Sequence, residues 1–154
     1  MKSVIITGAT RGIGLALARF YAEKGYCLTL NGGHNKDALT AVEKELSKKT
    51  QVITCLGSVA KETTAKTIVK KTLDTFGQID LLINNAGIAH IGLLSDMSSE
   101  EWHTLMGTNL DSVFYMSRAV IPHMVHRHSG KILNVSSVWG EVGASCEAAY
   151  SASK

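Results

Sequence analysis

Two side chains at the end of the chain have the types and spacing needed to deliver a proton to a carbonyl oxygen. Tyr150 and Lys154 lie four residues apart, and Ser137 lies thirteen residues before the tyrosine. Positions four apart share one helix face, so the Lys154 ammonium is expected beside the Tyr150 hydroxyl. A positive charge there favours phenolate and lowers a pKa that is ordinarily about 10. A Tyr-x-x-x-Lys spacing also occurs by chance on solvated helices, so its meaning depends on the motifs that precede it. Together with Ser137, the pair predicts carbonyl reduction.

A glycine-rich run near the start of the chain follows a short β-branched stretch at residues 2–7. The run comprises Gly8, Ala9, Thr10, Arg11, Gly12, Ile13 and Gly14. Gly8 permits a tight turn, Gly12 lets the backbone approach a pyrophosphate, and Gly14 allows a helix to pack closely on a strand. The phosphates then meet free N–H groups at a helix N-terminus. The run predicts a dinucleotide site, with an ordinary strand-to-helix turn as the alternative.

Strand-like and helix-like segments alternate along the chain without a repeat or a linker. We expect strands at 3–7, 26–31, 51–56, 81–84 and 131–135, and helices at about 12–24, 36–48, 61–76, 98–106 and 109–126. Right-handed crossovers between such strands give a parallel sheet in the order 3-2-1-4-5, with ligands at its carboxyl edge. The predicted fold class is a doubly wound α/β sheet of three layers, the Rossmann arrangement, incomplete at the C-terminus.

Two of these helices have an apolar face at helical spacing, which is predicted to be buried. In 61–76 the face comprises Ala65, Ile68, Val69, Thr72, Leu73 and Phe76. In 109–126 it comprises Leu110, Val113, Phe114, Ser117, Val120, Ile121 and Met124. Pro122, the one proline of the chain, is expected to kink or loosen the last turns of the second helix.

Five motifs, in order and at their intervals, resemble those of the short-chain dehydrogenase/reductase family. They are residues 7–14 (TGATRGIG), 84–87 (NNAG), Asn109, 134–137 (NVSS) and 150–154 (YSASK). The resemblance extends over all 154 residues and is nearest to the 3-oxoacyl-[acyl-carrier-protein] reductases of fatty acid biosynthesis. It implies an NAD(P)-dependent oxidoreductase that acts on a small-molecule or carrier-bound carbonyl. The same motifs serve reductases of fatty-acyl, sugar and steroid carbonyls, so they do not identify the substrate.

The resemblance also implies a role for each candidate site residue. Tyr150 is the proton donor, Ser137 orients the substrate oxygen, and Lys154 lowers the tyrosine pKa and holds the nicotinamide ribose. Asn109 resembles the family's helix-kink asparagine, whose backbone carbonyl holds a water of the proton relay; its residue type alone favours a helix cap. The cofactor-binding residues implied are Gly8, Thr10, Arg11, Gly12, Ile13, Gly14, Ser58, Val59, Asn85, Ala86, Gly87, Tyr150 and Lys154.

Charge near the glycine run favours NADPH over NADH. NAD-preferring folds place an acidic residue after the second strand, about 20 residues past the glycines. Here residues 31–36 read Asn-Gly-Gly-His-Asn-Lys and hold no acid, while Arg11 is placed to pair with a 2′-phosphate. Ser58 and Val59 stand where the family commonly has Asp-Val after the third strand, which weakens the expected hydrogen bond to adenine.

The composition is that of a globular chain, with 45% hydrophobic and 19% charged residues and a formal net charge of +3. The lysines are spread over amphipathic helices, so nothing indicates binding to nucleic acid or anionic lipid. The N-terminus enters a strand directly without an apolar signal core, and no stretch is long enough to span a bilayer. We expect a cytoplasmic protein that binds neither nucleic acid nor membranes.

Family members run to roughly 250 residues, so we expect residues 1–154 to be a single NAD(P)-binding domain truncated after Lys154. The substrate lid and the helix of the usual dimer are expected in the missing third. We call the chain continued through that third the long form, and expect it to be soluble, active and a homo-oligomer. The 154 residues alone are expected to aggregate, because the fifth strand is then an unpaired edge.

The remaining cysteines and histidines offer weaker signals. Cys27 and Cys55 lie in apolar strand-like runs and are expected to be packed, reduced thiols. Cys146, four residues before Tyr150, shares the tyrosine's helical face if the helix begins that early, and then forms part of a pocket wall. The histidines near the end of the long helix are expected to be solvated rather than metal ligands. They are His123, His126 and His128.

The leading hypothesis is NADPH-dependent reduction of a ketone to a secondary alcohol, most simply of a 3-oxoacyl thioester. Residues 143–147 (GASCE) also resemble reductases of aminopentanone-modified elongation factor P. Outside enzymes, the alternatives are a dinucleotide-binding regulatory module and an inert fragment. The intact Ser137, Tyr150 and Lys154 argue against the regulatory module, because a protein that only binds a dinucleotide needs no acid.

Overall fold

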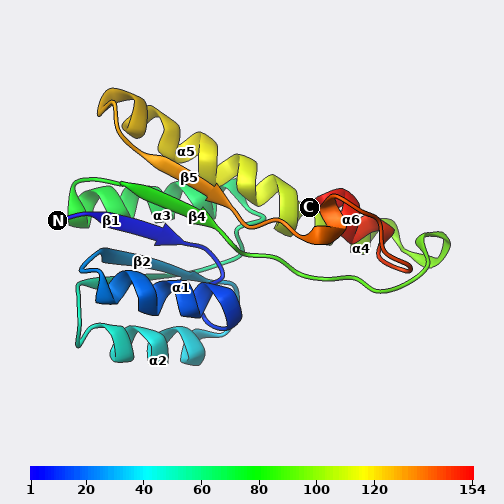
Figure 1. Cartoon of the computed structure of the whole chain (residues 1–154), viewed down its shortest axis with the longest axis horizontal. Helices are drawn as coiled ribbons and strands as arrows, with labels where there is room; N and C mark the ends of the chain where they lie inside the picture. Colours follow the sequence, from blue (N-terminus) through cyan, green and yellow to red (C-terminus); the bar gives the residue numbers. More distant parts are fainter.

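The computed structural model describes residues 1–154 and contains one five-stranded parallel sheet (Figure 1). Its strands are β1 Ser3–Ile6, β2 Cys27–Gly32, β3 Val52–Leu56, β4 Leu81–Asn84 and β5 Lys131–Asn134. They lie in the order β3-β2-β1-β4-β5, and every neighbouring pair is parallel. The predicted strand order is confirmed, and each predicted strand end lies within one residue of the observed one.

Helices cover both faces of the sheet, which confirms the predicted doubly wound fold class. The first two, α1 Gly12–Glu23 and α2 Lys36–Leu46, lie on one face, and α3 Glu62–Phe76 and α5 Ser112–His126 lie on the other (Figure 1). The remaining elements are α4 Ser99–Met106, α6 Ala148–Ser153 and the short turns η1 Leu94–Asp96, η2 Gly107–Asp111 and η3 Val138–Gly140. None of the helices combines the length and the apolar character needed to cross a bilayer.

Alternate side chains of the central strand enter two separate cores. Val4 and Ile6 of β1 pack with α1 and α2, whereas Ile5 packs with α3 and α5. All three side chains are fully buried. This alternation follows from the two-residue period of a strand and holds β1 rigidly between the helix layers. The carboxyl end of β1, where the glycine run begins, is therefore firmly positioned.

The buried face predicted for the long helix is wrong in part. The side of α5 that packs inward comprises Ser112, Met116, Val120 and Met124. Leu110, Phe114 and Ile121, predicted to be buried, are 46%, 54% and 45% exposed. Apolar residues occupy more than one side of α5, and the sheet and α3 cover only one side. The face predicted for α3 is correct at Ala65 and Ile68, which are fully buried.

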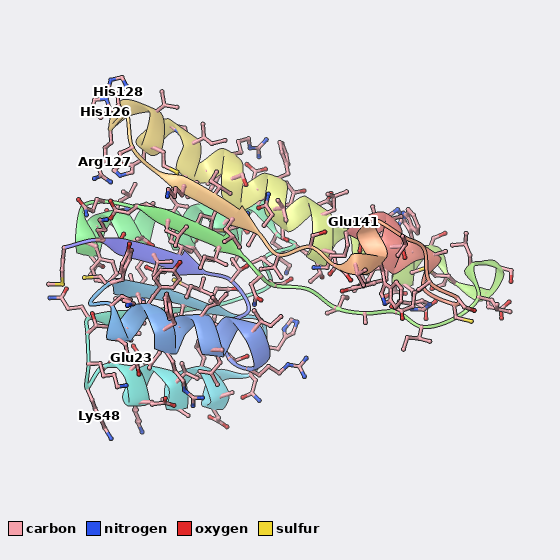
Figure 2. All side chains as sticks on the ribbon, viewed as in Figure 1. Glu23, Lys48, His126, Arg127, His128 and Glu141 are labelled. Atoms are coloured by element: carbon pink, nitrogen blue, oxygen red, sulfur yellow. The ribbon has the colours of Figure 1, made fainter.

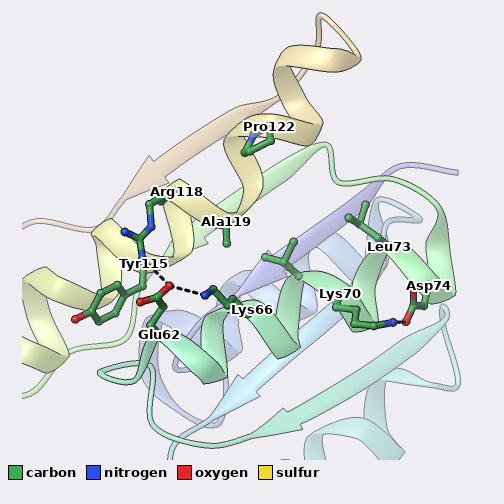
Figure 3. Close-up of a pocket in the computed structure, with 10 residues that line it drawn as sticks. Glu62, Lys66, Lys70, Leu73, Asp74, Tyr115, Arg118, Ala119 and Pro122 are labelled. Atoms are coloured by element: carbon green, nitrogen blue, oxygen red, sulfur yellow. Dashed lines mark hydrogen bonds and ion pairs between the residues drawn. The ribbon is translucent and has the colours of Figure 1, made fainter.

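Two hollows flank α5 on its solvent side. One, of about 440 Å³, lies between α3 and α5 and is crossed by ion pairs from Glu62 to Lys66 at 2.7 Å and to Arg118 at 2.8 Å (Figure 3). The other, of about 620 Å³, is lined by Phe114 and Pro122 among others. The candidate catalytic residues line neither hollow. α5 continues through Pro122, so the proline does not end the helix.

Beyond the carboxyl ends of β4 and β5 the chain forms a projection that we call the distal lobe, residues 86–111 and 136–154 (Figure 1). It contains η1, α4, η2, η3 and α6. Two hydrogen bonds join its segments: the Gly92 N–H donates to the Cys146 carbonyl, and the Asn109 amide donates to the Ser153 hydroxyl, both at 2.8 Å. The distal lobe thus brings residues that follow β4 against residues that follow β5.

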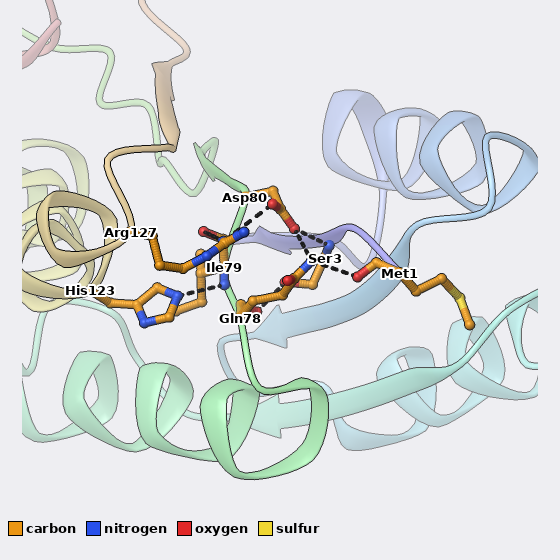
Figure 4. A network of polar contacts seen from close by, with 7 residues as sticks. All are labelled: Met1, Ser3, Gln78, Ile79, Asp80, His123 and Arg127. Carbon is orange, nitrogen blue, oxygen red and sulfur yellow. Dashed lines mark hydrogen bonds and ion pairs between the residues drawn. The ribbon is translucent and has the colours of Figure 1, made fainter.

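At the opposite edge of the sheet, Asp80 ties three segments together (Figure 4). Its carboxylate accepts hydrogen bonds from the Ser3 N–H at 2.8 Å, the Gln78 amide at 2.9 Å and the Arg127 guanidinium at 3.2 Å. The start of β1, the start of β4 and the end of α5 are thereby joined, far from the distal lobe.

His123 belongs to the same region and is not the solvated histidine that the sequence predicts. Its Nε2 accepts a hydrogen bond from the Ile79 N–H at 3.2 Å, which requires the neutral ring (Figure 4). Burial lowers the pKa of His123, and the neighbouring Arg127 and His126 lower it further, whereas Asp80 opposes the shift. His126 and His128 are exposed.

We expect His123 to make the long form less stable in acid. Its folded-state pKa lies below the ordinary value of about 6.5, so on acidification the unfolded chain binds a proton before the folded chain does. The stability that the neutral ring contributes is fully present above the unfolded-state pKa of about 6.5. It is lost as the pH falls from there through the lower folded-state pKa. His123→Gln keeps an acceptor for Ile79 but does not titrate. Urea unfolding between about pH 7 and 5 should show a steeper loss of stability for the parent than for His123→Gln, and equal slopes would contradict this role.

Candidate active site

The glycine run makes the turn from β1 into α1. Gly8 and Gly12 have φ angles of +65° and +55°, a conformation that residues with a side chain rarely adopt. At Gly14, a Cβ would overlap the Gly8 carbonyl and lie 2.6 Å from the Asn85 amide nitrogen. A Cβ on Gly12 would meet nothing within 4 Å, so the backbone there is open to a ligand. The tight turn at Gly8 and the close approach at Gly14 agree with the sequence analysis, whereas the approach of a pyrophosphate to Gly12 stays a prediction.

The first turn of α1 presents N–H groups to an anion. The helix begins at Gly12, and the Leu15 N–H donates to the carbonyl of Arg11 at 3.2 Å. The N–H groups before Leu15 have no acceptor within the helix, and the helix dipole adds partial positive charge. Thr10 and Arg11 lead into this turn, and the Arg11 side chain is exposed and forms no ion pair within the chain. The turn fits a pyrophosphate.

Hydrogen bonds attach the glycine run to the loop after β4. The Asn85 side-chain amide donates to the carbonyls of Thr7 at 2.9 Å and Gly8 at 3.1 Å. In return, the Thr7 hydroxyl accepts from the N–H groups of Asn85 and Ala86, both at 3.0 Å. Thr7 was absent from the predicted site residues, although it is the first residue of the motif at 7–14. These bonds hold loop 85–87 beside the phosphate turn.

Gly87 makes room for the lysine. A Cβ on Gly87 would lie 3.1 Å from Nζ of Lys154 and 3.4 Å from Oδ1 of Asn109. The Lys154 ammonium donates to the Val135 carbonyl at 3.1 Å. Burial lowers the pKa of Lys154. The loop after β4, the end of β5 and the end of α6 therefore meet around this one ammonium group.

Tyr150 lies within α6, and Lys154 follows the last residue of that helix. The Lys154 Nζ lies 5.9 Å from the centroid of the Tyr150 ring. The tyrosine side chain is half-buried. The ammonium and the tyrosine ring are therefore neighbours, as the four-residue spacing predicts.

The two serines after β5 have different bonds. The Ser136 hydroxyl donates to the Lys154 carbonyl at 2.8 Å and so fixes the end of α6. The Ser137 oxygen accepts from the Trp139 N–H at 3.2 Å, and its own proton is donated to no group of the chain. This arrangement favours Ser137 over Ser136 as the donor to a substrate oxygen.

Asn109 lies inside the π-turn η2 and is 3% exposed. Its side chain donates to the Ile88 carbonyl at 2.9 Å and to the Ser153 hydroxyl at 2.8 Å, and it accepts from the Ile88 N–H at 2.8 Å. The side chain is thus fully occupied in joining the distal lobe, and it caps no helix. π-turns inside helices are frequent at functional sites. The role assigned to the Asn109 backbone carbonyl stays a prediction.

At the other end of the site, Asn31 holds the loop after β3. Asn31 is 1% exposed. Its side-chain amide donates to the carbonyls of Cys55 and Gly57, both at 3.0 Å. Ser58 and Val59 follow directly; the Val59 side chain is buried, whereas the Ser58 hydroxyl is half-buried and accepts from the Ala60 N–H at 3.3 Å. Asn31 was not among the predicted site residues, because nothing in its sequence context distinguishes it from a polar residue at a strand end.

The chain was compared with known proteins to find the family to which it belongs. A family model described as short chain dehydrogenase matches residues 2–154. The chain belongs to the short-chain dehydrogenase family. The resemblance drawn from the five motifs is therefore confirmed.

Similar members of the family are named 3-oxoacyl-[acyl-carrier-protein] reductase FabG. Those of Staphylococcus epidermidis and Chlamydia muridarum are 38% and 39% identical over 154 and 155 residues. Each match covers 99% of this chain but only 63% and 62% of the relative, so the chain spans less than two thirds of their length. A metagenomic short-chain oxidoreductase solved in complex with NADP is 32% identical with a TM-score of 0.93, covering 99% of this chain and 69% of that one.

Within this short-chain dehydrogenase, the cysteines are placed as follows. Cys27 and Cys55 are buried free thiols, as predicted, and burial raises the pKa of both. Cys146 does not share the helical face of Tyr150, because α6 begins at Ala148. It is exposed in the preceding turn with a φ of +59°. The shared face was expected only if the helix began before Cys146, and this condition is not met.

Proposed function

We propose that the protein reduces a ketone to a secondary alcohol with NADPH. The observation that supports this function is the meeting of the motif segments at one edge of the sheet. Residues 8–14 and 85–87 are joined by hydrogen bonds, and a Cβ on Gly87 would meet both Nζ of Lys154 and Oδ1 of Asn109. This meeting supports a cofactor held on the glycine run with Tyr150 as the proton donor to the substrate.

Each residue has a part in the proposed reaction. NADPH, when bound, supplies the hydride that forms the new C–H bond at the carbonyl carbon and leaves as NADP⁺. Tyr150 gives its hydroxyl proton to the carbonyl oxygen, and Lys154 stabilises the phenolate that remains. Ser137 donates a hydrogen bond to that oxygen as its charge develops. Asn109 supports the relay that returns a proton to Tyr150.

Three features support NADPH as the cofactor. Arg11 is an exposed, unpaired cation at the phosphate turn. Residues 31–36 contain no acid to bind a 2′-hydroxyl. At Gly32, where β2 ends, a Cβ would lie 2.9 Å from the Thr10 methyl group, so an acidic side chain at this position would not fit without displacement.

For the substrate, likeness to the named 3-oxoacyl-[acyl-carrier-protein] reductases favours a 3-oxoacyl thioester. The distal lobe offers a surface for an apolar chain. Ile91 and Leu93 after β4 and Val142 before α6 are 76%, 58% and 54% exposed. Apolar side chains on both segments of the lobe suit a substrate whose ketone is attached to a hydrocarbon.

We expect Asn31 to support the adenine end of the cofactor site. Asn31→Ala removes the donors to two buried carbonyls and loosens the loop that carries Ser58 and Val59, so NADPH should bind about tenfold more weakly. Reduced nicotinamide mononucleotide, which lacks the adenosine part, should bind with unchanged affinity. Fluorescence titration of the long form measures both. Thr29→Val, a matched change at a buried polar residue of β2, should leave both affinities unchanged; equal losses for the two ligands in Asn31→Ala would contradict this role.

The proposed function is tested by turnover in the long form. A short, uncharged acetoacetyl thioester is supplied, and the loss of NADPH is followed together with formation of the 3-hydroxy product. We expect about one turnover per second or faster, within the ordinary range of enzymes, and much slower turnover with NADH. NADPH binding without reduction of any ketone would instead support the regulatory module.

A further inference from the structure

The helix α6, which contains the proposed proton donor, has little apolar support. It lies in the distal lobe, which extends away from the sheet; in Figure 2, Glu141 marks the lobe and Arg127 the far end of the molecule. The two buried residues of α6 are Ala149 and Ser153, 4% and 3% exposed, and neither core includes a residue of this helix. Since Ala149 offers only a methyl group, the position of α6 depends on its polar contacts.

Ser153 makes the one hydrogen bond that joins α6 to a segment distant in the sequence. Its oxygen accepts from the Asn109 side-chain amide at 2.8 Å, and its own proton is donated to the Tyr150 carbonyl at 2.7 Å. The other hydrogen bonds of residues 148–153 stay within the helix or reach the residues that flank it. A serine hydroxyl has a single proton, so Ser153 serves Asn109 as an acceptor.

Asn109 continues this connection to the loop after β4. One of its amide protons goes to Ser153 and the other to the Ile88 carbonyl, while its oxygen accepts from the Ile88 N–H. Turning the amide over would set like groups against each other at Ile88, so its orientation is fixed. Gly87 precedes Ile88, and a Cβ there would lie 3.1 Å from Nζ of Lys154. The contacts thus close a ring from this loop through Asn109, Ser153 and Lys154 back to the loop.

We infer that Ser153 is a positioning residue for the reduction, because it holds α6, with Tyr150 and Lys154, in place against the loop after β4. The inference rests on the proposed ketone reduction and adds a residue that contacts neither substrate nor cofactor. A shift of about 1 Å in a reacting group can slow an enzyme about 10²-fold, so one bond that fixes the helix is important for the rate. The glycine run is held to the loop by separate bonds from Asn85, so cofactor binding does not depend on Ser153.

Ser153→Ala in the long form tests this inference, because it removes the hydroxyl and leaves one Asn109 N–H without an acceptor. We expect kcat for reduction of an acetoacetyl thioester to fall about tenfold, while the Kd for NADPH changes less than about threefold. The fall of kcat at high pH, which reports loss of the proton from Tyr150, should move to higher pH. Lys154 is then held less closely and favours the phenolate less, so the tyrosine pKa rises. A uniform loss of folded protein would lower kcat without moving its pH dependence.

Further variants separate the hydrogen bond from changes in packing. Ser153→Thr and Ser153→Val have nearly the same shape, but only threonine keeps the hydroxyl, so its kcat should be at least about threefold higher than that of the valine variant. Ser151→Ala removes a hydroxyl of the same helix that has no hydrogen-bond partner, and it should leave kcat and its pH dependence unchanged.

Three outcomes would overturn the inference while leaving the proposed reductase intact. They are parental kcat and pH dependence in Ser153→Ala, a loss of the same size in Ser151→Ala, and equal rates for the threonine and valine variants. If the added methyl group prevents both of these variants from folding, Ser153→Ala and Ser151→Ala decide. Failure of the parent itself to reduce the thioester would overturn the proposed function, and the inference with it.

Discussion

Replacing Tyr150 by phenylalanine should lower the rate of ketone reduction by the long form about 10²-fold or more. The ring and its packing in α6 are retained, and only the proton donor is lost, which is the typical effect of removing a general acid. Stopped-flow measurement of hydride transfer with saturating NADPH would give the rate without a contribution from cofactor binding. Lys154, 5.9 Å from the ring centroid, then has no phenolate to stabilise.

Tyr115→Phe is the matched control for this substitution. Tyr115 is a half-buried tyrosine that lines the hollow between α3 and α5, away from the proposed site (Figure 3). Loss of its hydroxyl should leave the rate of reduction unchanged. Near-normal turnover by Tyr150→Phe would remove Tyr150 from the mechanism.

Replacing Arg11 by alanine should weaken NADPH binding by about 1.5 to 3 kcal/mol and leave NADH binding almost unchanged. The guanidinium is exposed and forms no ion pair within the chain, so its removal should not disturb the fold. The loss is confined to NADPH because only that cofactor has a 2′-phosphate. Titration of the long form with each cofactor measures the difference.

Arg19→Ala provides the comparison on the same helix. Arg19 is an exposed arginine of α1 that pairs with Glu45 at 2.7 Å. Such exposed pairs contribute little, so both cofactors should bind Arg19→Ala as they bind the parent. Equal losses of NADPH and NADH affinity in Arg11→Ala would show that the arginine does not recognise the 2′-phosphate.

Much of the fold could be predicted because local patterns and the global arrangement agree. Short apolar runs predicted each strand to within one residue, and the order of the sheet followed from the handedness of crossovers. The tight turn at Gly8 could also be predicted, since the chain passes there from a strand into a helix. The positive φ of Gly12 was not predicted.

The parts that could not be predicted depend on contacts between distant segments. Hydrophobic periodicity shows which residues of α5 are apolar but not which side faces the sheet, so Phe114 was misplaced. The bonds of His123 to Ile79 and of Thr7 to Asn85 join residues 44 and 78 positions apart, and no local pattern marks them. The distal lobe forms only when the loops after β4 and β5 are brought together.

Transfer of deuterium tests the proposed function most directly. The long form is supplied with an acetoacetyl thioester and NADPH that carries deuterium on the transferable C4 position, in ordinary water. If the protein is an NADPH-dependent ketone reductase, each molecule of alcohol should carry one deuterium on its carbinol carbon, and Tyr150→Phe should form the same product far more slowly. Product that takes this hydrogen from the solvent, or no product despite bound NADPH, would contradict the proposal.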